Sequence, residues 1–329
     1  MRDVRVEQRN YTPGKQVVLR YEVDLAEPGQ HARTLRFYGK TYGDSRSRYV
    51  YRALVAACER LAGNPGPLEV PRTLLHLDPL YTYWLEEWSG GPLSTLYGTP
   101  ELVPSLPRVA AALAQLHRLE LADLEEAPSP ADITRRVLEV GGTIARFLPG
   151  ERDRVIRLAD RVAAAGAAPL LGEPPAAVAV HGAFRMTQLL GRGTRIAVTD
   201  FDKIARGDPH LDVAEFEASH VFQHFRRGLD LSALLREAAS FRVAYEREAP
   251  WPLDARRLDW LVSVALLERL RRAVKSLKTR LFPRIDEIYA LVECYLARMR
   301  QRWPGVAVLL SVLRPLAGWW VDLPEAGEV

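Results

Sequence analysis

The feature that most constrains the fold is a change of sequence pattern near residue 90. Before it, apolar and polar residues alternate in short stretches, and residues 16–23 and 34–42 are rich in β-forming types. A Pro-Gly pair between these stretches predicts a turn, so the two strands should form an antiparallel hairpin. After the Ser-Gly-Gly-Pro run at 89–92, apolar residues recur at helical spacing instead. Strands followed by helices indicate an α+β protein.

Each half has further expected elements. The first has one helix and a second strand pair, expected over residues 46–61, 73–77 and 81–88. The second has helices over 106–119, 131–147 and 151–165, with four or more beyond residue 210, and a short β insert at about 178–202. We therefore expect a small antiparallel β lobe over residues 1–88 and a larger, mostly helical lobe over 89–329.

Composition excludes several other classes of protein. The 329 residues are 48% hydrophobic and 26% charged, which is typical of a globular chain and not of a disordered one. Cys58 and Cys294 have neither a disulfide-framework spacing nor a metal-ligand spacing. The first residues are charged, and the apolar run at 306–310 is far too short to cross a bilayer. We therefore expect a cytoplasmic protein with no signal peptide and no membrane contact.

The basic residues carry two signals. Only five of the 45 are lysines, an excess of arginine that fits either coding bias or adaptation to heat. Against that background each of the five lysines, including Lys40, is a candidate for a functional role. Six basic residues cluster over 269–280, but no aromatic residues interleave with them. That pattern is typical of a solvated helix face, so nucleic acid is not an expected partner.

The candidate chemistry lies between residues 178 and 214. Two short apolar stretches, 178–180 and 196–198, predict strands that flank a turn and carry polar residues at their ends. This arrangement brings the loop over 181–188 beside Asp200. A carboxylate facing a loop amide suits a hard cation such as Mg²⁺, which prefers oxygen ligands. A hairpin with a solvent-facing aspartate explains the same residues, so the residues alone leave both readings open.

Several motifs together resemble one known family. The stretch HGAFRMTQLL followed by IAVTDFDKIARGDPHLDVA resembles the catalytic core of the aminoglycoside phosphotransferase and choline kinase family. FYGKTY around Lys40, LEEWSGGPL and AAALAQLH resemble further motifs of that family and occur in its order. The resemblance covers roughly residues 10–220. It implies a two-lobed protein-kinase-like fold, with ATP and Mg²⁺ as cofactors.

The resemblance also implies how the phosphates of ATP would be held. Lys40 stands where the family's lysine contacts the α- and β-phosphates. Its candidate partner is Glu59, because no other acidic residue follows Asp44 in the expected first helix. The plain alternative for this pair is an exposed lysine and a glutamate near a helix end.

Other matched positions concern the base and the metal. Glu87 and Trp88 fall in the segment that resembles the adenine-contacting hinge. Asp200 stands where the family's aspartate binds Mg²⁺ and offsets charge on the β- and γ-phosphates. Asp208 and Asp212, in RGDPHLDVA, are expected to cap and anchor the following helix.

The catalytic loop departs from the family's pattern at three positions. His181 is kept, but Ala183 stands at the catalytic aspartate, Arg185 at the second histidine and Gln188 at the metal-ligating asparagine. Gln188 keeps an amide oxygen, whereas Ala183 cannot accept a proton. General-base catalysis contributes roughly 10²–10⁴-fold. Phosphoryl transfer depends mostly on positioning and electrostatics, so the loss weakens activity without abolishing it in principle. Asp202 is near in sequence and is a candidate replacement.

Two functions remain open. The chain is either an atypical phosphotransferase that uses ATP and acts on a sugar or another small hydroxyl-bearing molecule, or a pseudokinase that senses nucleotide or binds a protein partner. In this family the later helices help to form the acceptor site. Residues 254–302 contain twelve basic and six acidic residues, so we expect a neutral or anionic acceptor rather than a polycation.

Overall fold

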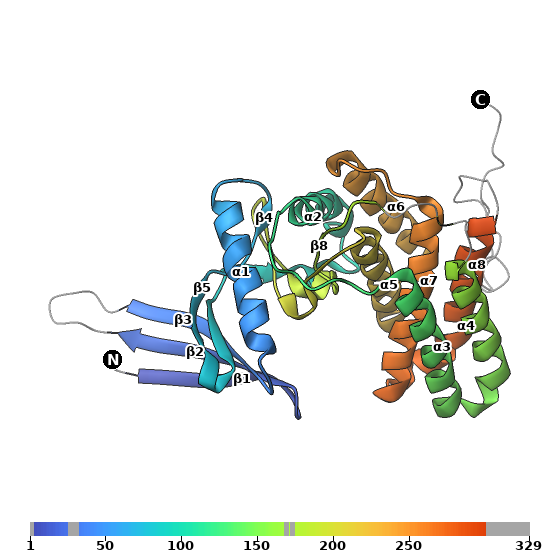
Figure 1. Cartoon of the computed structure of the whole chain (residues 1–329), viewed down its shortest axis with the longest axis horizontal. Coiled ribbons are helices and arrows are strands. Elements are labelled where there is room, and N and C mark those ends of the chain that lie inside the picture. The colour runs from blue at the N-terminus through green and yellow to red at the C-terminus, as the bar shows by residue number, and fades with distance from the viewer. Residues whose placement is uncertain (1–2, 26–32, 168–170, 172–174, 301–329) are drawn as a thin grey trace. The chain divides into compact units, whose positions relative to one another are not determined.

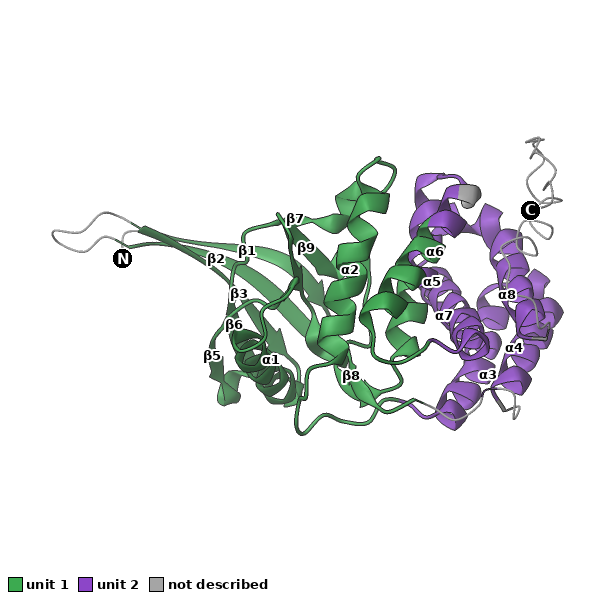
Figure 2. Ribbon diagram, turned by 90° about the horizontal axis from the view of Figure 1, so that it is seen from above, with its two compact units in different colours: residues 1–127, 174–216, 237–252 green, residues 128–173, 217–236, 253–329 purple. Residues whose placement is uncertain are grey.

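The computed structural model describes residues 3–25, 33–167, 171 and 175–300. The chain forms two compact units, each assembled from three stretches of sequence (Figure 2). The first unit comprises residues 1–127, 174–216 and 237–252, and the second comprises residues 128–173, 217–236 and 253–329. Helices α5 (His210–Arg227) and α6 (Leu231–Glu248) contribute residues to both. The boundary expected at residue 88 stays a prediction.

Five antiparallel strands form the N-terminal sheet of the first unit, in the order β1-β2-β3-β6-β5 (Figure 2). They are β1 (Asp3–Thr12), β2 (Gln16–Leu25), β3 (Arg33–Tyr42), β5 (Thr73–Leu77) and β6 (Thr82–Glu86). The expected pairing of β2 with β3 is confirmed, while the turn expected at 26–32 lies outside the described residues. The sequence analysis did not predict β1. Four of its ten residues are charged and its apolar content is low, so its sequence lacks the usual signal of a strand.

One helix, α1 (Arg46–Ala62), packs against the strands of this sheet and confirms the expected helix. Its buried face consists of small and apolar residues, Ser47, Val50, Ala53, Leu54 and Ala57. The helix ends at Gly63, within the predicted stop signal. Its buried face therefore presents no acidic side chain to the sheet.

Two smaller sheets follow in the same unit. One has the order β4-β10-β9-β7, and the other pairs β11 with β8. Their strands are β4 (Leu68–Glu69), β7 (Gly91–Pro92), β8 (Val178–Val180), β9 (Leu189–Arg192), β10 (Arg195–Val198) and β11 (Ala205–Gly207). The two apolar stretches predicted to flank one turn, β8 and β10, are thus in different sheets. The physical reason is that each finds its own antiparallel neighbour, β11 for β8 and β9 for β10.

The central helix of the first unit is α2 (Leu102–His117), which contacts β4, β8 and β10. It begins four residues before the expected start, because Pro104 falls in its first turn, where a missing N–H leaves no hydrogen bond unmade. Leu106, Val109 and Leu113 are fully buried on it. α2 therefore fixes the ends of the strands around which the candidate site is built.

The second unit is helical. Its main helices are α3 (Pro130–Phe147), α4 (Arg152–Ala167), α7 (Ala255–Lys275) and α8 (Ile285–Arg300). α3 packs against α4 and α7, and it starts at a capping box in which Ser129 and Asp132 satisfy each other's backbone N–H groups. The helices predicted over 131–147 and 151–165 are confirmed by α3 and α4.

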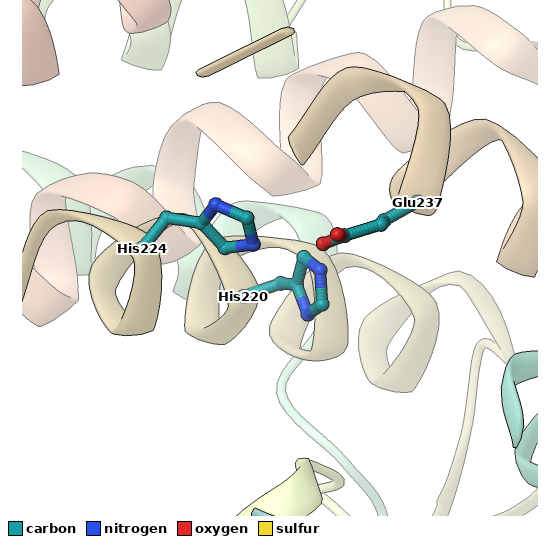
Figure 3. A group of neighbouring side chains, drawn as sticks. All are labelled: His220, His224 and Glu237. Carbon is teal, nitrogen blue, oxygen red and sulfur yellow. The ribbon is translucent and has the colours of Figure 1, made fainter. Parts of the chain in front are cut away.

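Two neighbouring histidines lie on α5. His220 and His224 lie on successive turns of α5, with ring centroids 4.9 Å apart, and Figure 3 shows them with Glu237, a residue of α6. The His224 Nδ1 atom lies 3.2 Å from the Asp230 carbonyl oxygen.

Among the described residues, no helix is both long and apolar enough to span a membrane.

Candidate functional site

Lys40 is the centre of the polar cluster in the first unit. It lies on β3 opposite Tyr83 of β6, and only 8% of its surface is exposed. Its Nζ donates hydrogen bonds to Asp200 Oδ1 at 2.7 Å and to Asp202 Oδ1 at 2.5 Å. Burial alone would lower the pKa of Lys40, but Tyr83 and the two carboxylates outweigh burial and raise it. The ammonium therefore stays charged.

Asp200 follows β10 and has an unusual backbone. Its φ of 68° and ψ of 61° lie in the left-handed region, which a non-glycine residue occupies only at an energetic cost. Its second carboxylate oxygen, Oδ2, accepts a hydrogen bond from Gln188 Nε2 at 2.7 Å. Burial would raise the pKa of Asp200, but the charge of Lys40 outweighs it and lowers that pKa. The structure thus brings three predicted residues, Lys40, Gln188 and Asp200, together.

Both the side chain and the backbone carbonyl of Asp202 accept hydrogen bonds from neighbouring residues. Its Oδ1 accepts from Lys40 Nζ and, at 2.5 Å, from the Tyr42 hydroxyl. Burial raises the pKa of Tyr42, so that hydroxyl stays protonated and acts as a donor. The Asp202 backbone carbonyl accepts two N–H groups of Arg46. An aspartate tied in this way is poorly suited to replace a missing base.

The 181–188 loop is pinned by a buried aspartate. Asp212 accepts hydrogen bonds from the backbone N–H of His181 at 2.6 Å and of Gly182 at 2.8 Å, and from His117 Nε2 at 3.1 Å. Burial would raise the pKa of Asp212, but the His117 hydrogen bond and nearby charges outweigh burial and lower it. The sequence assigned Asp212 to anchoring the helix in which it lies. The structure corrects this, because its oxygens point to backbone donors of the loop instead.

Two details fix the loop further. Gly182 has a φ of +71°, and a Cβ there would lie 2.5 Å from the Lys203 carbonyl oxygen, so no other residue fits without movement. Asp208 Oδ1 accepts from the His210 backbone N–H at 2.9 Å and contacts its Nδ1 at 2.6 Å. Asp208 thereby supports the start of α5, as expected.

His181 is a buried packing residue. Its Nε2 donates to the Thr199 carbonyl oxygen at 3.0 Å, and its ring packs edge-on against Phe184 and Phe201. Its Nδ1 is buried and has no hydrogen-bond partner among the described residues. Burial lowers the pKa of His181, so the ring is neutral near pH 7. The structure thus buries the side chain of this predicted catalytic residue completely.

The loop has no carboxylate at position 183, where the motifs predict a catalytic aspartate. Ala183 is 6% exposed, so its methyl group is packed into the core. Arg185 Nε donates to Thr187 Oγ1 at 3.0 Å, and Arg185 Nη1 lies 3.8 Å from Glu215 Oε1. Glu215, on α5, was not predicted from the sequence. Its spacing of one helical turn from Asp212 is the only signal that places it on the loop-facing side.

Both predicted hinge residues are hydrogen-bonded to side chains of other strands. Glu87 binds Arg20 through two parallel hydrogen bonds of 2.8 Å and accepts from the Tyr38 hydroxyl at 3.2 Å. The hydrogen bond from Arg20 lowers the pKa of Glu87. Trp88 Nε1 donates to Glu69 at 2.5 Å. Glu87 is therefore an ionised carboxylate that another strand already holds.

A cavity of about 680 Å³ lies beside this hinge. Its lining includes Arg20, Arg36, Glu87 and Trp88, and it does not include Lys40 or Asp200. The cavity therefore adjoins the predicted hinge residues, and its lining is distinct from the polar cluster around Lys40.

The structure does not bring Glu59 to Lys40. Glu59 is exposed near the C-terminal end of α1, away from the buried face of that helix. Lys40 instead takes both of its carboxylate partners from the turn that contains Asp200 and Asp202. Counting acidic residues along a helix found the one candidate available, but helical periodicity turns that position toward solvent.

Comparison with solved structures identifies the fold. No protein-family model and no curated protein matches the chain. An aminoglycoside phosphotransferase from Alicyclobacillus acidocaldarius has a TM-score of 0.59 at 15% identity, covering 90% of this chain and 92% of its own. A thermostable mutant of aminoglycoside phosphotransferase APH(4)-Ia, in a ternary complex with ADP and hygromycin B, has a TM-score of 0.58 at 16% identity, covering 89% and 93%.

A second group of kinases has the same architecture. A choline/ethanolamine kinase family protein from Mesorhizobium loti has a TM-score of 0.54 at 14% identity, covering 94% of this chain and 92% of its own. At sequence identities this low, the structural similarity shows a common fold and nothing further. The chain therefore has the α+β, protein-kinase-like fold of these phosphotransferases, as the sequence motifs predicted.

Proposed function

We propose that the first unit binds ATP with Mg²⁺ and that the phosphates lie at the cluster of Lys40, Asp200 and Gln188. The observation that carries the proposal is a buried, charged lysine hydrogen-bonded to a carboxylate whose other oxygen faces an amide. Lys40 supplies a compact positive charge for phosphate oxygens. The backbone strain at Asp200 supports the same reading, because such strain concentrates at functional sites.

The donor atoms fit Mg²⁺. This ion prefers carboxylate and amide oxygens and keeps several waters, so two protein ligands suffice. Asp200 Oδ2 and the side-chain amide of Gln188 lie together, and rotation of that amide by half a turn presents Oε1 in place of Nε2. When bound, the ion would neutralise charge on the phosphates. Lys40, Asp200 and Gln188 would position the nucleotide.

From this binding site two functions follow. In the first, the protein transfers a phosphoryl group to a hydroxyl of a small molecule, with positioning and electrostatics as its main contributions. The loss of a base at Ala183 would reduce the rate by roughly 10²–10⁴-fold. In the second, the protein is a pseudokinase that binds nucleotide and acts through binding alone. The second is favoured by specific contacts, since Asp202 is tied to Lys40 and Tyr42 and His181 is buried and neutral.

Calorimetry with ATP and Mg²⁺ tests the binding site. Lys40→Ala and Asp200→Ala should each weaken ATP binding at least tenfold, or about 1.4 kcal/mol, because each removes a charge that faces the nucleotide. Lys278→Ala is the matched control, since it removes an exposed lysine of the second unit. Unchanged ATP affinity in both site variants would remove the nucleotide-site assignment.

Turnover assays separate the two functions. If the protein is an enzyme, ATP consumption with a panel of hydroxyl acceptors should be measurable and should vanish in Asp200→Ala. If it is a pseudokinase, the wild-type protein should bind ATP and show no transfer to any acceptor. Because binding is measured separately, a failure of the enzyme reading leaves the nucleotide site standing.

We also propose that an acceptor, if one is used, is neutral or anionic. Support comes from the excess of basic residues over 254–302, of which Arg302 lies outside the described residues. Some of these bases are paired within the second unit, as Arg271 is with Glu268 and Arg284 is with Glu287. A thermal-shift screen tests the proposal. Stabilisation by polycationic aminoglycosides, with none by sugars or anions, would contradict it.

A further inference from the structure

The outer edge of β1 is an exposed strand edge of the first unit. β1 is the first strand of the five-stranded sheet, and among the described residues no strand pairs with its outer edge (Figure 1). Residues 3–11 of this strand are exposed, with Val4 and Val6 at 41% and 54%. An unpaired strand edge offers a row of backbone donors and acceptors, which natural proteins protect or use for pairing.

The two faces of β1 differ in chemistry. Val4 pairs with Val23, and Val6 pairs with Tyr21, whose ring stacks on Phe37 at a centroid distance of 5.0 Å. The opposite face of β1 carries Asp3, Arg5, Glu7 and Arg9, which alternate in sign along the strand. Charges of one sign would repel a second copy of the strand, whereas alternating signs can pair with themselves.

Antiparallel pairing of β1 with a second β1 has few possible registers. Opposed residues must lie on the same face of the sheet, so each two-fold register is centred on a single residue. A centre at Arg5 sets Arg5 against itself and Asp3 against Glu7, and a centre at Glu7 sets Glu7 against itself and Arg5 against Arg9. Both oppose like charges, which is destabilising. Centres at Val4 and Gln8 oppose opposite charges, but each matches only two of the four charged residues, Asp3 with Arg5 or Glu7 with Arg9.

A centre at Val6 has the opposite result. It sets Arg5 of each copy against Glu7 of the other, Asp3 against Arg9, and Val6 against Val6. The two central Arg5–Glu7 oppositions then join opposite charges, and Asp3 and Arg9 stand at the ends of the paired segment. The register of β1 with β2 shifts between Gln8 and Asn10, so a bulge limits the regular strand and ends the pairing segment near Arg9.

We propose that the β1 edge is a self-pairing surface and that its partner is a second copy of this chain, joined antiparallel about a two-fold axis at Val6. The argument rests on charge complementarity along the edge and is independent of the proposed nucleotide site. Within one chain, Arg5 contacts Asp3 and Glu22, and Arg9 contacts Glu7. Arg5 and Arg9 are 68% and 45% exposed, so they can also face the other copy.

The expected association is weak and salt-sensitive. One pair of strands buries little surface, and each exposed ion pair contributes little, so a dissociation constant on the order of tens of micromolar is expected. Sedimentation velocity of the full chain from ~1 to ~300 μM should show a monomer–dimer equilibrium at low salt. At ~1 M salt, the dissociation constant should rise at least tenfold, because exposed ion pairs are screened.

Charge reversal provides the decisive test. Arg5→Glu opposes two carboxylates in each half of the interface, and Glu7→Arg opposes two guanidinium groups, so each variant alone should be monomeric. Mixed in equal amounts, the two variants should form a heterodimer, because each introduced charge then faces the opposite charge of the other chain. Arg60→Glu, a reversal at the exposed end of α1, is the control and should dimerise like the wild type.

Folding of each variant is checked by its circular dichroism and thermal midpoint. Loss of the dimer in both single variants and its return in the mixture would establish the interface and its register. A wild-type chain that is monomeric at every concentration would overturn the proposal. So would a dimer that persists in both single variants, or a mixture of well-folded variants that stays monomeric.

Discussion

The turn at Asp200 and the loop at 181–188 lie side by side in the first unit, yet they differ in how far their residues match the predicted motifs. In the turn, Asp200 hydrogen-bonds with both Lys40 and Gln188, and the proposed nucleotide site rests on these contacts. The loop is held by hydrogen bonds to Asp212, and a buried methyl group, Ala183, stands where the motifs predict a catalytic aspartate. The contacts that hold the turn and the loop therefore do not depend on which residue stands at position 183.

The difference teaches what holds the loop in shape. The backbone conformation of 181–183 depends on Asp212 and on the left-handed Gly182, and neither needs an acid at position 183. An apolar side chain can therefore replace the acid without disturbing the anchor. A loop with the right shape is consequently no evidence for turnover, and the two regions must be tested separately.

The largest expected effect comes from removing the anchor itself. Asp212→Ala leaves the backbone N–H groups of His181 and Gly182 and the ring of His117 without their buried acceptor. Each such group costs about 1–3 kcal/mol, so chemical denaturation should show a loss of about 3 kcal/mol or more. Asp212→Asn keeps one carbonyl acceptor and should lose less. Equal stability of Asp212→Ala and wild type would show that the loop is held by other contacts.

A second change sharpens the comparison by adding the missing group. Ala183→Asp should raise ATP turnover or phosphoryl transfer tenfold or more, because the supporting contacts of the loop and of Asp200 are in place. Ala183→Asn, which has nearly the same shape and cannot accept a proton at neutral pH, is the matched control. No gain in well-folded Ala183→Asp would mean that the catalytic fault extends to Arg185 or beyond.

The third prediction concerns pH. The pKa of His181 is lowered by burial, so below about pH 6.5 the unfolded state takes up a proton that the folded state does not. Stability should therefore fall as pH drops from 7 to 5, by up to about 1.4 kcal/mol per pH unit from this residue. His181→Gln should flatten this part of the profile when the unfolding free energy is measured at each pH. An identical slope in variant and wild type would exclude His181 as the source.

The fold was largely predictable from the sequence, and the reasons are physical. The paired strands β2 and β3 and the helix α1 follow from alternation, helical spacing and a Gly-Pro stop, which are local signals. β1 escaped prediction because an exposed edge strand needs little apolar content. The separation of β8 from β10 escaped as well, since partner choice among short strands depends on the whole unit.

The candidate site was predictable in part. The motifs singled out Lys40, Gln188 and Asp200, and the structure brings the three side chains together through hydrogen bonds to Asp200, while their roles stay a prediction. The contacts of Asp202 with Tyr42 and of Arg185 with Glu215 join segments distant in sequence, and no local pattern reports them. Asp212 was singled out for the right reason, an anchoring role, but the anchored element could only be found in three dimensions.

The smallest expected effect separates the two candidate partners of Lys40. Glu59 is exposed on α1, whereas Asp200 and Asp202 bind the Lys40 ammonium directly. Glu59→Ala should therefore change the free energy of unfolding by less than about 0.5 kcal/mol and ATP affinity by less than about twofold. Denaturation and calorimetry measure both quantities. A tenfold loss of ATP affinity in this variant would mean that α1 turns Glu59 toward Lys40 when nucleotide binds, and that the turn at Asp200 shares the lysine with the helix instead of holding it alone.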